Sequence, residues 1–188
     1  MALRLEMKGV VRTRERLQRL AGKIEDMSDL WPRMGDVLAD LEEGWFMSEG
    51  YGTWDQLAES TAKYKAAHGF PDLILQRTEQ LRESLTDPLE AMQVGQGRST
   101  LGTFTRNSMT WGTDVRDPRP ESSGQEYAHF HQGTDGVTGE PTIHYNHWSG
   151  ELLPVRQPIP WPLPINWQVE MDHAAEEWLD EAVRESAA

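Results

Sequence analysis

Apolar side chains recur every three or four residues from Leu17 to Trp45, with charged residues between them. This spacing places the apolar side chains on one face of an α-helix, and it predicts a long amphipathic helix that begins after an N-cap at Thr13. Pro32 lies within the stripe and cannot donate a helical hydrogen bond, so we expect a kink or a break near Trp31. We interpret the stripe as core packing rather than as a ligand-binding surface.

Shorter elements follow this helix. Helical spacing that ends at a glycine or before a proline indicates short helices, whereas alternating apolar and polar residues indicate strands. Five prolines between Pro154 and Pro164 exclude a central strand there and predict an extended arm. We expect helices at 54–69 and 72–87, strands at 2–11, 89–100 and 102–115 with a hairpin turn at 106–108, and a final helix capped by Asn166.

Together these elements predict an α+β fold that forms one domain over residues 1–188. A long kinked N-terminal helix and short helices would pack on a small antiparallel sheet, with a C-terminal helix. Residues 134–165 would form an extended loop and the proline-rich arm.

The formal net charge is −13, and an acidic surface repels the phosphate backbone, so we do not expect specific binding of nucleic acid. The charge is uneven. Seven basic and two acidic residues lie from Arg4 to Lys23, whereas seven acidic residues and one arginine lie from Glu170 to Glu185. Ends of opposite charge suit head-to-tail packing of identical subunits. The alternative interpretation is that both charged segments are helix faces exposed to solvent. No apolar run is long enough to predict a transmembrane helix, and the N-terminus does not resemble a signal peptide.

Four of the six histidines lie close together in the sequence, at His129, His131, His144 and His147. Imidazole binds zinc well, so one hypothesis is a small metal-dependent hydrolase that uses this cluster. Against it, the chain has no cysteine, and histidines two residues apart on a helical turn point about 200° apart. Nucleophile elbows and phosphate-binding glycine loops are also missing from the sequence. We therefore prefer surface or interface histidines, expect no metal or other cofactor, and do not predict an enzyme.

A succession of short motifs indicates a different class of protein. Their order resembles that of the virion-morphogenesis or tail-completion proteins of tailed bacteriophages, over about residues 30–185. Glu79 stands where the family pattern has a glycine, and residues 134–151 form an insertion. The motifs are Trp54 with Leu57, Thr61 with Lys65, "ILQRTEQLRESL" at 74–85, "MQVG" at 92–95, "MTWGT" at 109–113, "YAHFHQG" at 127–133 and "PVRQPI" at 154–159, before the final helix.

The resemblance implies a structural protein of the virion neck, assembled in the host cytoplasm, which completes the upper end of the tail and helps to join it to the head. Its partners would be other copies of itself in a ring, for which a hexamer is one option, the head connector or stopper proteins, and the tail terminator or tail tube proteins. DNA would at most pass through a channel without specific binding. Candidate interface residues, chosen by charge or aromatic character, are Arg14, Arg16, Arg19, Trp148, Arg156, Trp161, Trp167, Glu176, Glu177 and Asp180.

Overall fold

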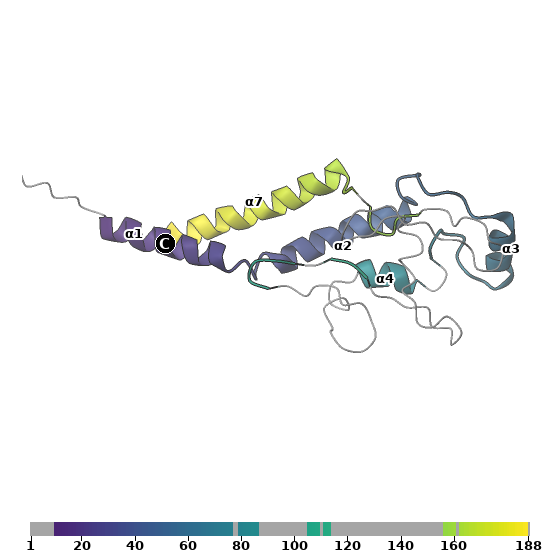
Figure 1. Ribbon diagram of the computed structural model, residues 1–188, viewed down its shortest axis with the longest axis horizontal. Helices are drawn as coiled ribbons and strands as arrows, with labels where there is room; N and C mark the ends of the chain where they lie inside the picture. Colours follow the sequence, from purple (N-terminus) through teal and green to yellow (C-terminus); the bar gives the residue numbers. More distant parts are fainter. Residues whose placement is uncertain are drawn as a thin grey trace, which may run out of the picture.

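The computed structural model describes residues 10–76, 79–86, 105–109, 111–113, 156–160 and 162–187. Within them α2 and α7 lie side by side along the long axis of the molecule (Figure 1). The C-terminal end of α7 meets α1 at one end of the molecule, α4 packs beside α2, and α3 lies at the opposite end. The helices are α1 (Val10–Glu25), α2 (Trp31–Met47), α3 (Glu59–Ala67), α4 (Gln80–Thr86) and α7 (Ile165–Ala187).

The predicted α+β fold with an antiparallel sheet is wrong for the part of the chain that the structure describes, which is helical and contains no strand. The chain does turn at 106–107, where the amide of Thr105 donates to the carbonyl of Ser108 at 2.8 Å. Within the described ranges, the two ends of this turn do not continue as paired β-strands. The turn instead packs against Met27 and against Trp31, the first residue of α2. The amide of Met27 donates to the carbonyl of Arg106 at 2.8 Å, and the indole of Trp31 donates to that of Thr105 at 2.8 Å. The predicted strand at 89–100 and residues 2–9 of the one predicted at 2–11 lie outside the described residues, and the last two residues of the latter, Val10 and Val11, belong to α1.

The long N-terminal helix is divided in two, as the position of Pro32 predicts. Helix α1 ends at Glu25, and α2 begins at Trp31 with the proline in its first turn, where a missing amide hydrogen breaks no helical bond. The division also splits the apolar stripe. Its second half supplies core residues of α2, whereas Leu17 and Ile24 of α1 are 61% and 49% exposed.

A cluster of tryptophans organises the core where α2, α4 and the first half of α7 meet. The Trp45 ring lies edge-on to those of Tyr51, Trp54 and Trp167, with centroids 5.0, 6.1 and 6.2 Å away. Aromatic rings favour such edge-to-face contacts, which contribute beyond the burial of their area. The buried members of the cluster are Leu38, Trp45, Phe46, Trp54, Ile74, Leu75, Leu81, Leu85 and Trp167.

Two glycine positions shape the ends of helices. Gly69 follows α3 with φ +70°, which confirms the predicted left-handed cap. Gly50 has φ +68° in the turn after α2, and a Cβ there would lie 2.5 Å from the indole of Trp54. Two predicted N-caps are wrong. Thr13 lies inside α1, which begins at Val10. Asn166 lies inside α7, which begins at Ile165, and its amide donates to the Tyr51 hydroxyl at 3.1 Å.

Two predicted helices are shorter than expected. The helix predicted at 54–69 begins only at Glu59, and that predicted at 72–87 is present as Gln80–Thr86. Leu75 and Glu79 have φ of 58° and 61°, a left-handed conformation that interrupts a right-handed helix. None of the helices in the described ranges combines the length and the apolar character needed to cross a bilayer.

Candidate functional site

The basic and acidic segments of the sequence meet within one chain, at the junction of α1 and α7. The Arg16 guanidinium donates to the carbonyl of Ala187 at 2.8 Å, and that of Arg19 donates to the carbonyl of Ser186 at 2.6 Å. The carbonyls at the C-terminal end of a helix carry partial negative charge, so they attract cations. Arg33 pairs with Glu181 farther along α7. Part of the charge complementarity that suggested contacts between subunits is therefore satisfied inside the subunit.

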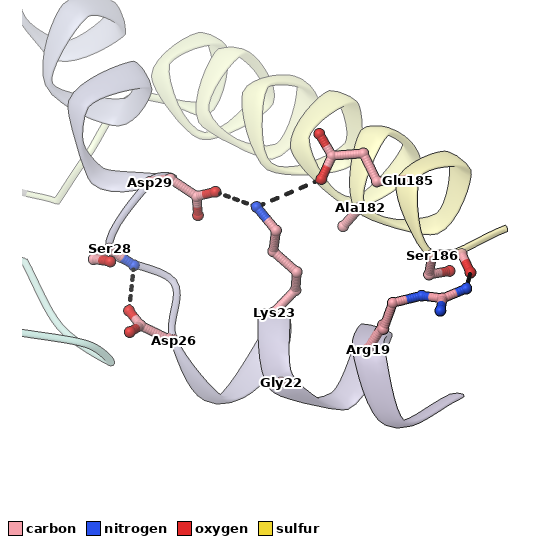
Figure 2. Close-up of a pocket in the computed structure, with 9 residues that line it drawn as sticks. All are labelled: Arg19, Gly22, Lys23, Asp26, Ser28, Asp29, Ala182, Glu185 and Ser186. Atoms are coloured by element: carbon pink, nitrogen blue, oxygen red, sulfur yellow. Dashed lines mark hydrogen bonds and ion pairs between the residues drawn. The ribbon is translucent and has the colours of Figure 1, made fainter. Parts of the chain in front are cut away.

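A cleft of about 630 Å³ lies at this junction, and Lys23 lies at its centre (Figure 2). The Lys23 ammonium lies 2.6 Å from a carboxylate oxygen of Asp29 and 3.6 Å from one of Glu185, so it joins α1, the segment after it and α7. The indole of Trp178 donates to the other oxygen of Asp29 at 3.0 Å. A single cation thus links three segments of the chain.

Three charged groups in this cleft have pKa values that are shifted away from pH 7. The hydrogen bond with Asp29 raises the pKa of Lys23, and the same bond lowers the pKa of Asp29, with a smaller contribution from Trp178. The pKa of Asp26 is also lowered, first by the side chain of Ser28 and then by its amide, which donates to the carboxylate at 3.2 Å. General acids and bases work best with a pKa near the operating pH. These shifts move the pKa values of Lys23, Asp29 and Asp26 farther from pH 7, so the arrangement suits ion pairing rather than proton transfer.

The predicted interface residues divide into buried and exposed groups. Arg156 is buried, and its guanidinium donates to the carbonyls of Asp55 at 2.8 Å and Gln56 at 3.0 Å. Trp167 is fully buried, and its indole donates to the Tyr51 hydroxyl at 3.2 Å. Both side chains hold the subunit together in this conformation.

Four other candidates are exposed. Arg14 lies on α1, and Glu176, Glu177 and Asp180 lie on α7. A carboxylate oxygen of Glu177 lies 3.9 Å from the imidazole Nε2 of His173 on the same helix. Trp148, Trp161 and the four histidines at 129, 131, 144 and 147 lie outside the described residues. Within the described ranges, no three histidine, aspartate or glutamate side chains are grouped so that they could hold a metal ion.

One unusual group, the carboxyl of Glu42, was not identified from the sequence. Glu42 of α2 is fully buried, and neither of its carboxylate oxygens has a hydrogen-bond partner among the residues that the structure describes. Burial raises its pKa well above the ordinary value; the nearby Trp111 indole acts in the opposite direction, but the two groups do not reach hydrogen-bond geometry. Its place in the sequence was a signal, because it lies four residues after Leu38 and three before Trp45, on the apolar face.

The motif residues that resemble the phage family come together around the core. Trp54, Ile74 and Leu81 belong to the buried cluster, and Leu57 packs against it. The ammonium of Lys65 is buried and donates to the carbonyl of Leu73. The described motif residues thus serve packing and the fixing of loops.

Glu79, the residue that departs from the phage-family pattern in the sequence analysis, has φ +61°. Its carbonyl accepts from the amide of Glu83 at 2.8 Å, and its carboxylate lies 3.2 Å from the Arg82 guanidinium. L-residues rarely adopt this left-handed conformation, which glycine adopts readily. The backbone at this position therefore has the conformation that a glycine would favour.

Comparisons with known proteins identify no relative of this chain: no protein-family model, no curated protein and no solved structure matches it.

Proposed function

We propose that this protein is a non-enzymatic structural component of the neck of a tailed-phage virion. It completes the upper end of the tail as a ring of identical subunits and helps to join the tail to the head connector. The proposal begins from the order of the motifs along the chain.

The left-handed backbone at Glu79 is the observation that carries the proposal. For an L-residue this conformation costs about 1–2 kcal/mol, so it needs support from the surrounding structure. The phage pattern has glycine at this position, and a motif that demands this backbone accounts both for the family glycine and for the conformation of Glu79. This support comes from the backbone conformation of Glu79, whereas the order of residue types along the chain first suggested the resemblance.

The roles of the motif residues also support a structural protein. Two basic side chains of the motifs are buried and bind backbone carbonyls: Lys65 donates to Leu73, and Arg156 donates to Asp55 and Gln56. A buried cation is costly unless it is hydrogen-bonded, so both side chains fix loops against the core. A subunit that joins the head to the tail must resist mechanical force, and loops fixed against the core make the subunit rigid.

The test is to delete the gene for this chain from the phage that encodes it and to examine the lysate by electron microscopy. We expect filled heads and tails that remain separate, and we expect joined infectious particles when the purified protein is added. Two variants form a matched pair for complementation of the deletion. Lys65→Met removes the hydrogen bond to the carbonyl of Leu73, whereas Lys63→Met alters an exposed lysine of the same helix. Complete, infectious virions from the deletion strain would refute the proposal.

A further inference from the structure

An outward-facing apolar strip on α1 remains uncovered in the subunit. Arg14, Leu17, Ala21 and Ile24 follow each other at intervals of three or four residues, so they share one side of the helix. All four are exposed. We call them the α1 outer face. The opposite side of the helix carries Arg16, Arg19 and Lys23, which contact α7 of the same chain. Figure 2 shows the contacts of Arg19 and Lys23.

A second uncovered strip lies on α7. Ile165 and Val169 are 79% and 57% exposed, and Leu179 and Val183 are exposed as well. Trp167, Ala174 and Trp178 are buried on the other side of the same helix. Intervals that alternate between four and three residues are typical of helices that pair along a seam. The α7 outer face is formed by Ile165, Val169, Asp172, Glu176, Leu179 and Val183.

The charges at the centre of each face select the partner. Arg14 interrupts the α1 outer face, whereas Asp172 and Glu176 interrupt the α7 outer face, and none of the three forms an ion pair in the described part of the chain. Two α1 outer faces would bring arginines together, and two α7 outer faces would bring carboxylates together. Like charges in close apposition disfavour a pairing, so an α1 outer face fits an α7 outer face.

The two faces of one chain cannot satisfy each other, because α1 already presents its basic side to its own α7. We propose that the α1 outer face of one copy docks on the α7 outer face of the next copy. Two different patches then meet at each contact, and such a head-to-tail contact closes into a ring when the rotation between copies permits. This inference rests on the proposed function in one respect, namely that the subunits form a ring, and it names the surfaces that join them.

Two charge-reversal variants test the pairing by analytical ultracentrifugation. Arg14→Glu places a carboxylate opposite Asp172 and Glu176, and the double variant Asp172→Arg/Glu176→Arg places arginines opposite Arg14. We expect each variant alone to raise the concentration for half-assembly about tenfold or more, because like charges then face each other. An equimolar mixture restores assembly, because every contact between unlike copies is again complementary.

Matched controls use the same helices and the same changes of charge. Arg12 lies about 160° around α1 from Arg14, and Glu170 lies about 120° around α7 from Glu176, at 100° per residue. Both control positions are exposed, so Arg12→Glu and Glu170→Arg should leave assembly unchanged. Circular dichroism of each variant verifies that the helices are intact.

A wild-type chain that stays monomeric, or assembly that the two variants do not weaken, overturns the α1–α7 contact. Weakened assembly that the mixture does not restore overturns it as well, because the pairing requires exchange of charge between copies. None of these outcomes depends on other virion proteins. Failure of the neck function would appear separately, as intact virions from the deletion strain.

Discussion

The buried carboxyl of Glu42 makes the stability of the protein depend on pH. Within the described part of the chain, neither of its oxygens has a hydrogen-bond partner, and burial favours the neutral form, so its pKa in the folded state is raised well above 4.5. In the unfolded chain the carboxyl is hydrated and releases its proton near the ordinary value. Above that pH the unfolded state binds fewer protons than the folded state, so the free energy of unfolding falls as the pH rises.

The magnitude follows from proton linkage. Between the unfolded and the folded pKa of Glu42, the loss of stability is about 1.4 kcal/mol for each pH unit. Glu42→Gln keeps a side chain of similar size but cannot ionise. The free energy of unfolding of this variant minus that of the wild type should therefore grow by about 1.4 kcal/mol per pH unit from pH 4.5 up to the raised pKa of Glu42 in the folded state.

The assay is urea unfolding, followed by tryptophan fluorescence at several pH values between 4.5 and 8. Taking the difference between the two proteins cancels the titration of groups that they share, including the histidines. Asp36 is exposed on the same helix, so Asp36→Asn serves as the matched control and should run parallel to the wild type. A Glu42→Gln curve that also runs parallel to the wild type would refute the reasoning, because Glu42 would then ionise equally in both states.

Three further outcomes follow from the packing. Gly50→Ala should lower the free energy of unfolding by about 2 kcal/mol or more, since it combines a strained positive φ with a 2.5 Å approach to Trp54, and urea unfolding measures this loss. Glu79→Gly should be more stable than Glu79→Ala by about 0.5–1 kcal/mol in thermal unfolding. Both variants lose the carboxylate, but only glycine relieves the strain of the left-handed backbone conformation, so equal melting temperatures would contradict this explanation. Trp167→Ala should cost about 3–5 kcal/mol, because it empties a fully buried site, and a loss below 1 kcal/mol would show that this side chain is not part of the core.

Some features of the fold could be predicted from local patterns. The break at Pro32, the left-handed Gly69 and a C-terminal helix each depend on a few neighbouring residues, so their signals are present in the sequence. The predicted strand at 102–115 is wrong where it can be judged, at 105–109 and 111–113. The carbonyls of Arg106 and Thr105 instead accept hydrogen bonds from Met27 and Trp31, and no local pattern identifies such distant partners.

The predicted interface residues illustrate the same limit. Charge and aromatic character selected Arg14, Arg156 and Trp167 alike, yet only Arg14 is exposed on an outer helix face, whereas Arg156 and Trp167 are buried. Composition cannot distinguish a buried tryptophan from one displayed to a partner, because both uses favour a large side chain with a polar tip.

The sequence by itself determined the apolar stripe from Leu17 to Trp45 and which end of the chain is basic or acidic, because these properties depend only on the order of residues along the chain. Tertiary structure alone decided what lies against each helix face. It brought the basic side of α1 to the end of α7, left Leu17 and Ile24 uncovered, and enclosed Glu42 without a hydrogen-bond partner among the described residues. The physical reason is that burial and hydrogen bonding are contacts between segments distant in the chain, and helical periodicity specifies a face but not its partner.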